Sequence, residues 1–166
     1  MPQVLPVQLK KNIRRNSHQG MIPTIDFIEE AIVIRELELD INRAGLHEIT
    51  HQLNQMVGDS GIDEGLCTIF IRHTSASLTI QENADPSCQR DLEQWLNRLV
   101  SRGDEIYTHT SEGEDDMPAH IKSMLTQTSV GIPVISGHLV LGTWQGIFLW
   151  EHRQSSHRRK LVIHLG

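Results

Sequence analysis

The sequence has little cysteine and no motif that pairs it. Cys67 and Cys88 are the two thiols of the 166-residue chain, and they form no CxxC motif. Two distant thiols do not make a disulfide framework, so a reducing compartment is the simpler expectation, and we expect a cytoplasmic protein. Cys67 lies among apolar residues such as Leu66 and Ile69, which predicts a buried small hydrophobe rather than a nucleophile.

Long apolar runs and the familiar catalytic signatures are also missing. No stretch approaches the roughly 20 apolar residues of a membrane-spanning helix, so no membrane partner is expected. There is no glycine-rich P-loop, no GxSxG elbow and no HExxH pair, so the usual nucleotide, hydrolase and protease signatures are absent. The chain length fits one domain that can bury a core without a disulfide or a structural metal.

Acidic residues are absent from one end of the chain. Residues 1–25 contain four basic residues and no acid, so the overall net charge of −6 leaves −10 for residues 26–166. An acidic body is a poor partner for nucleic acid, because contacts to phosphate dominate that affinity. Residues 1–24 lack the apolar core of a secretory signal. We expect them to form a basic, flexible extension before a single domain at 25–166.

The predicted strands and helices follow one another without regular βαβ alternation. Strands are predicted where β-branched and apolar residues gather or alternate, and helices where apolar residues recur every three or four positions. The predicted strands are 27–39, 65–72, 77–80, 131–135, 146–151 and 159–165, and the predicted helices begin near Ile49, Asp85 and Pro118. This order favours an α+β fold with a largely antiparallel sheet and about three helices.

The helix after Asp85 has the clearest pattern. Asp85 and Pro86 suit the N-cap and the first helical position. Apolar residues then recur at helical spacing, at Leu92, Trp95, Leu96, Leu99 and Val100. Because Trp95 lies at the centre of this stripe, we predict that it packs in the core and contacts no ligand.

The segment 109–120 is rich in groups that could bind a metal. It contains His109, Glu112, Asp115, Asp116 and His120, with little apolar side chain to bury. Neighbouring acids repel one another unless a cation, a proton or hydrogen-bond donors offset the charge. Imidazole and carboxylate are also common ligands of divalent metals. The alternative is a solvated acidic loop that caps a helix near Pro118, and the segment alone does not decide between the two.

Three further polar clusters could take part in chemistry. Residues 73–75, His-Thr-Ser, follow a predicted strand, although a turn with local hydrogen bonds would also explain them. Asn83 is not easily explained by helix capping. Glu151 and Arg153 form the third cluster, and an arginine fork suits phosphate. The basic residues at 158–160 are interpreted as a solvated hairpin turn.

Several short blocks occur in an order that points to one family. They are His73-Thr-Ser-Ala76, Asn83-Ala-Asp85-Pro86, Glu112-Gly113 through Asp115-Asp116-Met-Pro-Ala-His120-Ile-Lys122, Gly142-Thr-Trp144-Gln145-Gly146 and Glu151-His-Arg153. Each block alone is weak evidence, whereas the ordered set is specific. Over about residues 25–165 the chain strongly resembles the YjbQ-like family, whose members are often labelled secondary thiamine-phosphate synthase enzymes.

The resemblance implies a compact α+β domain that assembles as a homotrimer. It also implies a divalent metal, zinc or magnesium, with His73, His109 and His120 as its ligands. The activity attached to the family joins a pyrimidine diphosphate to a thiazole phosphate and releases pyrophosphate. Divalent cations and arginines neutralise the charge of such a leaving group.

We therefore expect a metal-dependent enzyme, a transferase resembling a thiamine-phosphate synthase, that acts on small phosphorylated heterocycles. The candidate catalytic residues are Glu112, Asp115, Asp116 and Asn83, and the candidate substrate contacts are Arg153, Lys122 and Glu151. Two alternatives stay open. One is a metal-assisted phosphohydrolase with water as the acceptor, and the other is a non-catalytic homotrimer that binds a metal or a small ligand.

Overall fold

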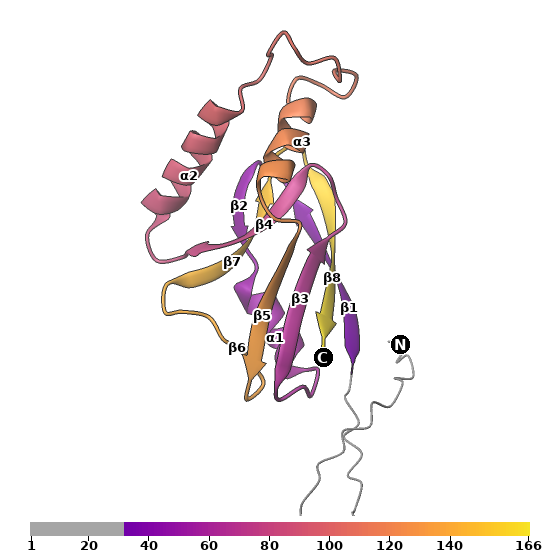
Figure 1. The fold of residues 1–166 in the computed structure, drawn as a ribbon, viewed down its shortest axis with the longest axis vertical. Coiled ribbons are helices and arrows are strands. Elements are labelled where there is room, and N and C mark those ends of the chain that lie inside the picture. Colours follow the sequence, from indigo (N-terminus) through magenta and orange to yellow (C-terminus); the bar gives the residue numbers. More distant parts are fainter. Residues whose placement is uncertain (1–31) are drawn as a thin grey trace, which may run out of the picture.

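The computed structural model describes residues 32–166. The predicted extension at 1–24 and the first residues of the predicted domain lie outside them. Within the described range the chain forms three helices and two antiparallel sheets, which confirms the α+β expectation (Figure 1). No helix in this range is long and apolar enough to cross a membrane.

The strands form one larger and one smaller sheet, and every pairing is antiparallel. The larger sheet has the order β1-β8-β3-β5-β6, with bounds Val33–Ile41, His157–Leu165, Gly65–Ile71, Ser129–Ile135 and His138–Leu139. The smaller has the order β2-β7-β4, with bounds Gly45–Glu48, Gln145–Glu151 and Ala76–Glu82. The sequence missed β2 and β6, which are too short to show a period of their own.

Alternating side chains of the strands build the main core. On β3, the buried residues Cys67, Ile69 and Ile71 alternate with more exposed ones, and β8 follows the same period. Cys67 is therefore a core residue, as predicted. Burial raises the pKa of its thiol to about 11, so it stays protonated and unreactive at neutral pH.

Each predicted helix is present close to its predicted start. Helix α1 spans Thr50–Gly58, α2 spans Pro86–Leu99 and α3 spans Asp116–Leu125. The Asp85 side chain caps α2 by accepting a hydrogen bond of 2.8 Å from the backbone N–H of Ser87, which confirms the predicted N-cap. Helix α3 lies against β4, above the ends of the strands in Figure 1.

The prediction that Trp95 packs in the core is wrong. Trp95 is 56% exposed and Leu99 is 57% exposed. Only one edge of the apolar stripe is covered, because α2 meets the rest of the domain through Leu96 and through Val100 just after the helix. These two join a small second core with Phe148 and other residues of β2 and β7. Helical spacing located the apolar face but not how much of it is buried.

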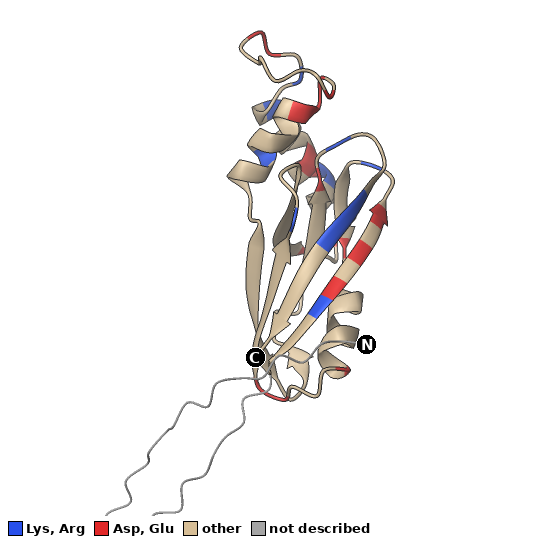
Figure 2. Ribbon diagram, turned by 90° about the vertical axis from the view of Figure 1, so that its right-hand side faces the viewer, with Lys and Arg blue, Asp and Glu red and all other residues tan. Residues whose placement is uncertain are grey.

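The interpretation of residues 158–160 as a solvated turn is also wrong, because they lie within β8. Arg158 faces Asp40 and Lys160 faces Glu38 across the β1–β8 pair, and both pairs form exposed salt bridges of 2.8 Å. Figure 2 shows the acids along β1 beside the basic residues of β8. Arg159 points to the other face and is buried.

Candidate functional site

The structure brings three of the predicted site residues together. His109 comes from the loop before α3, whereas Asp116 and His120 lie one turn apart at the start of that helix. The Nε2 atom of His109 is 2.9 Å from Oδ2 of Asp116, and Nε2 of His120 is 3.7 Å from Oδ1. Candidate ligand atoms of all three residues lie within 4.8 Å of one another. The carboxylate is buried, while both imidazoles reach solvent.

A backbone contact orients the ring of His120. Its Nδ1 atom is 3.0 Å from the carbonyl oxygen of Thr74, which can only accept a hydrogen bond. In the neutral ring Nδ1 therefore carries the proton and donates it, and Nε2 keeps its lone pair near Asp116. This arrangement is typical of histidines that bind a metal through Nε2.

Arg153 neutralises the carboxylates around this cluster. Its guanidinium forms an ion pair with Oδ1 of Asp116, and it lies 3.3 Å from Oδ1 of Asp115 and 3.7 Å from Oε2 of Glu112. Burial would raise the pKa of Asp115, but the backbone N–H of Gln154 and the charge of Arg153 outweigh burial and hold that pKa below its ordinary value. Phosphate binding by Arg153 stays a prediction. A bound phosphate would have to displace these carboxylates from the guanidinium.

One oxygen of Asp116 has no hydrogen-bond partner among residues 32–166. Oδ2 is buried and is close to His109, but no donor in this range is aligned with it. A buried carboxylate oxygen without a partner costs free energy. The position can therefore accept a cation.

Two predicted site residues lie elsewhere in the described chain. The Nε2 atom of His73 accepts a hydrogen bond of 2.9 Å from the backbone N–H of Lys160, so the structure does not bring this ring to the other two histidines. Burial and then the charge of Arg159 lower the pKa of His73. Asn83 follows the far end of β4 and donates a hydrogen bond of 3.2 Å to Glu48.

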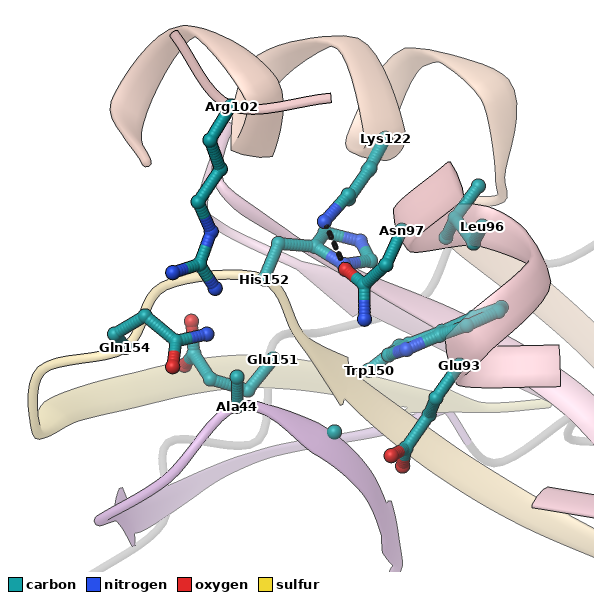
Figure 3. Close-up of a pocket in the computed structure, with 11 residues that line it drawn as sticks. Ala44, Glu93, Leu96, Asn97, Arg102, Lys122, Trp150, Glu151, His152 and Gln154 are labelled. Atoms are coloured by element: carbon teal, nitrogen blue, oxygen red, sulfur yellow. Dashed lines mark hydrogen bonds between the residues drawn. The ribbon is translucent and has the colours of Figure 1, made fainter. Parts of the chain in front are cut away.

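The two remaining residues, Lys122 and Glu151, line a cavity of about 250 Å³ beside a different face of α3 (Figure 3). Lys122 is only 4% exposed, and its Nζ donates a hydrogen bond of 2.6 Å to Oδ1 of Asn97. Burial and then the charge of Arg102 lower the pKa of Lys122. Glu151 is buried as well, and its two carboxylate oxygens are held by Arg159 at 2.5 and 2.6 Å. The predicted substrate contact of Glu151 is untested, and its carboxylate is already paired.

A neutral histidine lies beside Lys122 in the same cavity. His152 is buried, and its Nε2 is 2.9 Å from Oγ of Ser77. Burial and then the charges of Lys122 and Arg159 lower the pKa of His152 to about 3, so the ring is uncharged at neutral pH. The ring also lies against Trp150, with the ring centroids 5.7 Å apart.

Sequence reasoning missed Asn97, Arg102 and His152 as neighbours of Lys122. His152 lay in a noted cluster, between Glu151 and Arg153, where the charged neighbours drew attention away from it. Asn97 directly follows Trp95 and Leu96 of the apolar stripe on α2. A polar residue at the edge of such a stripe was the only sequence signal for its place in the cavity. Arg102 lies in the loop after α2 and carried no signal.

The fold and the site together define a class of protein. It is a small α+β domain of two antiparallel sheets, with a His–Asp–His cluster where a short helix begins. The chain belongs to the UPF0047 family, described as YjbQ-like, which matches residues 35–166.

Relatives and solved structures agree with this assignment. A UPF0047 protein of Synechocystis is 53% identical over 120 residues, which are 72% of this chain and 82% of that protein. YjbQ of Escherichia coli O157:H7 is 41% identical over 132 residues, 79% of this chain and 95% of its own. A YjbQ/UPF0047 protein of Clostridium acetobutylicum has a similar crystal structure, with a TM-score of 0.73 and 34% identity, covering 80% of this chain and 99% of that one. A YbjQ-like protein of Sulfolobus solfataricus, described as of unknown function, gives a TM-score of 0.72 at 26% identity, covering 81% and 97%.

Proposed function

We propose that the protein is a metal-dependent enzyme that acts on small phosphorylated heterocycles. The reaction proposed is the thiamine-phosphate synthase type, in which a pyrimidine diphosphate is joined to a thiazole phosphate and pyrophosphate leaves. The observation that carries the proposal is the buried Asp116 between the rings of His109 and His120, with one oxygen that has no hydrogen-bond partner in the described part of the chain.

The donor set fits a divalent metal. Two imidazole nitrogens and one carboxylate oxygen suit zinc or a similar borderline metal, whereas magnesium prefers oxygen ligands alone. Ligand atoms of a tetrahedral zinc ion lie about 3.4 Å apart. The distances of 2.9 and 3.7 Å from Asp116 to His109 and His120 lie on either side of that value. His109 and His120 with Asp116 would hold the ion, and His73 lies outside this set.

The residues around the cluster fit the proposed chemistry. A bound divalent metal would supply positive charge to stabilise a departing diphosphate. The contact to Thr74 holds His120 in one orientation, so the site needs little rearrangement to bind. Arg153 lies between Asp115 and Asp116 and offsets their negative charge, and the exposed Glu112 side chain reaches solvent, where it could approach a substrate or its bound cation.

Metal content and product release test the proposal. Purified protein should contain a stoichiometric divalent metal, and should release pyrophosphate from the pyrimidine diphosphate when the thiazole phosphate is present. His109→Ala and His120→Ala should each lose metal and turnover while staying folded, whereas His164→Ala in β8 serves as the matched control. Full metal occupancy in both variants would rule the site out. Release without an acceptor would indicate a phosphohydrolase, and metal without turnover would indicate a binding protein.

We also propose that the chain assembles as a homotrimer. Large apolar side chains are exposed on the outer face of β3, at Leu66 and Phe70, and on α2, at Trp95 and Leu99. Exposed apolar clusters of this kind support contact with another protein surface. Light scattering should give three times the chain mass of 18.9 kDa. A monomer across the micromolar range would contradict the proposal.

A further inference from the structure

Two cationic side chains line the cavity beside α3. Lys122 comes from α3 and Arg102 from the loop after α2, and both line this cavity (Figure 3). Among the residues that the structure describes, neither forms an ion pair with a carboxylate, and the one hydrogen bond of Lys122 Nζ goes to the neutral Asn97. We propose that this cavity is a binding subsite for a small oxyanion, such as the phosphate group of a substrate.

Two acids, Glu93 and Glu151, also line the cavity. Oε1 of Glu93 accepts a hydrogen bond of 2.8 Å from the backbone N–H of Leu46. Glu151 is paired with the buried Arg159. Glu151 is balanced by Arg159, so Lys122 and Arg102 face Glu93 as the one lining carboxylate without an ion pair among the described residues. The net charge of the cavity lining is therefore positive.

The burial of Lys122 favours binding of an anion in the cavity, because the ammonium group has little contact with solvent. A lysine this deeply buried without an ionic partner is unusual, because a long charged side chain normally keeps its head in water. The ammonium group carries three donor hydrogens, and Asn97 accepts only one of them. An oxyanion in the cavity could accept from Lys122 and from the guanidinium of Arg102 together, as charge-assisted hydrogen bonds.

The size of the cavity suits a phosphate-sized group rather than a whole substrate molecule. Its volume of about 250 Å³ is below the roughly 300–1,000 Å³ that is usual for sites that enclose a drug-sized ligand. Arg102 and Gln154 line both this cavity and a neighbouring one that contains Glu112, Asp115 and Arg153. An anion held at Lys122 would thus leave the rest of the molecule facing the acidic segment. That the anion belongs to the substrate rests on the proposed function, whereas binding of the anion itself does not.

Calorimetric titration with inorganic sulfate and phosphate tests the subsite. The full-length chain should bind both anions. Lys122→Met keeps the apolar stem but removes the amine, and it should weaken binding roughly 10- to 100-fold, as expected for a lost hydrogen bond between charged groups. Arg102→Met, at an exposed loop position that should not disturb folding, should weaken binding severalfold. Lys160→Met removes an exposed amine that is paired with Glu38, and it should leave the affinity unchanged.

Two outcomes would overturn the subsite. One is unchanged affinity in Arg102→Met together with unchanged affinity in Lys122→Met, or in Lys122→Gln if the first lysine variant does not fold. The other is loss of sulfate binding in His109→Ala, which would place the anion on the metal instead. Retained sulfate binding in a His109→Ala protein without metal supports the subsite even if the proposed catalytic function fails.

Discussion

The two sides of helix α3 differ in which buried charges they contain and in how these charges are paired. On one side, Asp116 and its acidic neighbours are buried or half-buried around a single guanidinium, that of Arg153. On the other side, Lys122 is buried beside the neutral His152 and the amide of Asn97. In the first region Arg153 lies beside three carboxylates, whereas in the second Lys122 has no carboxylate partner among the residues that the structure describes.

This difference predicts how the stability of each region responds to mutation and to ligands. A paired buried charge is costly to break, because removing one partner leaves the other uncompensated. An unpaired buried cation is a standing cost that a ligand can relieve. The acidic side should therefore be sensitive to mutation in the free protein, and the lysine side should be sensitive to bound anions.

The largest effect is expected for Arg153→Met. It leaves Asp115 and Asp116 close together without their shared cation, and should cost about 3–5 kcal/mol of unfolding free energy. Denaturant unfolding at neutral pH measures the loss. Arg158→Met, which breaks an exposed pair with Asp40, is the matched control and should change stability little.

The double variant Arg153→Met, Asp116→Asn sharpens this first prediction. Removing the buried carboxylate as well should restore part of the lost stability, because the uncompensated charge disappears. Equal stability of the single and the double variant would mean that Arg153 acts through packing rather than through charge.

Acid should destabilise the lysine side through His152. Its pKa is about 3 in the folded chain and near 6.5 when unfolded, so the unfolded state binds the extra proton between these values. Stability is full above about pH 6.5 and falls as the pH drops toward 3, by roughly 1.4 kcal/mol per pH unit. Urea unfolding at several pH values in a chelator, which removes any metal contribution, measures the slope.

His152→Gln tests the assignment of that slope. The amide can still reach Ser77 but does not titrate, so the slope should fall by the contribution of one proton. His73, whose pKa is lowered as well, adds to the slope that remains. Identical slopes in the wild type and His152→Gln would show that His152 is not the acid-sensitive group.

The smallest effect is expected for Trp95→Ala. Because Trp95 is mostly exposed, the substitution should change the unfolding free energy of the isolated chain by less than about 0.5 kcal/mol. Leu96→Ala, its buried neighbour beside the cavity, should cost about 2–5 kcal/mol. Denaturant unfolding at concentrations where the chain is monomeric compares the two. A large loss for Trp95→Ala would mean that the tryptophan packs within its own chain.

The sequence carried much of the fold because local patterns encode it. The alternation in β3, the N-cap at Asp85 and the start of α1 near Ile49 each appear in a few consecutive residues, and the structure follows them. What failed depends on tertiary packing. The exposure of Trp95 and the place of Arg159 in the core are set by which surfaces meet, and helical or strand spacing does not determine that.

The sequence predicted the types of residue in the candidate site better than it predicted which of them lie together. The composition of the segment 109–120 indicated a possible metal site, and His109, Asp116 and His120 of this segment lie together. The predicted ligand set was His73, His109 and His120. The sequence could not predict that Asp116, rather than His73, lies beside the two other histidines. His73 is held instead by the backbone N–H of Lys160 in β8, which is far away in the sequence. The cavity of Lys122 combines α2, α3, β7 and two loops, so no single segment signals it.

The contact between His120 and Thr74 has a consequence for how the domain opens. Together with the hydrogen bond of 3.0 Å from Ser123 Oγ to the carbonyl of Ala76, it fastens α3 to the start of β4. Local opening of the helix must break both contacts at once. Any ligand that holds His120 in place therefore also raises the free energy of that opening. The backbone amides of α3 should then exchange with solvent more slowly when the site is filled, although most of them lie outside any contact with the ligand.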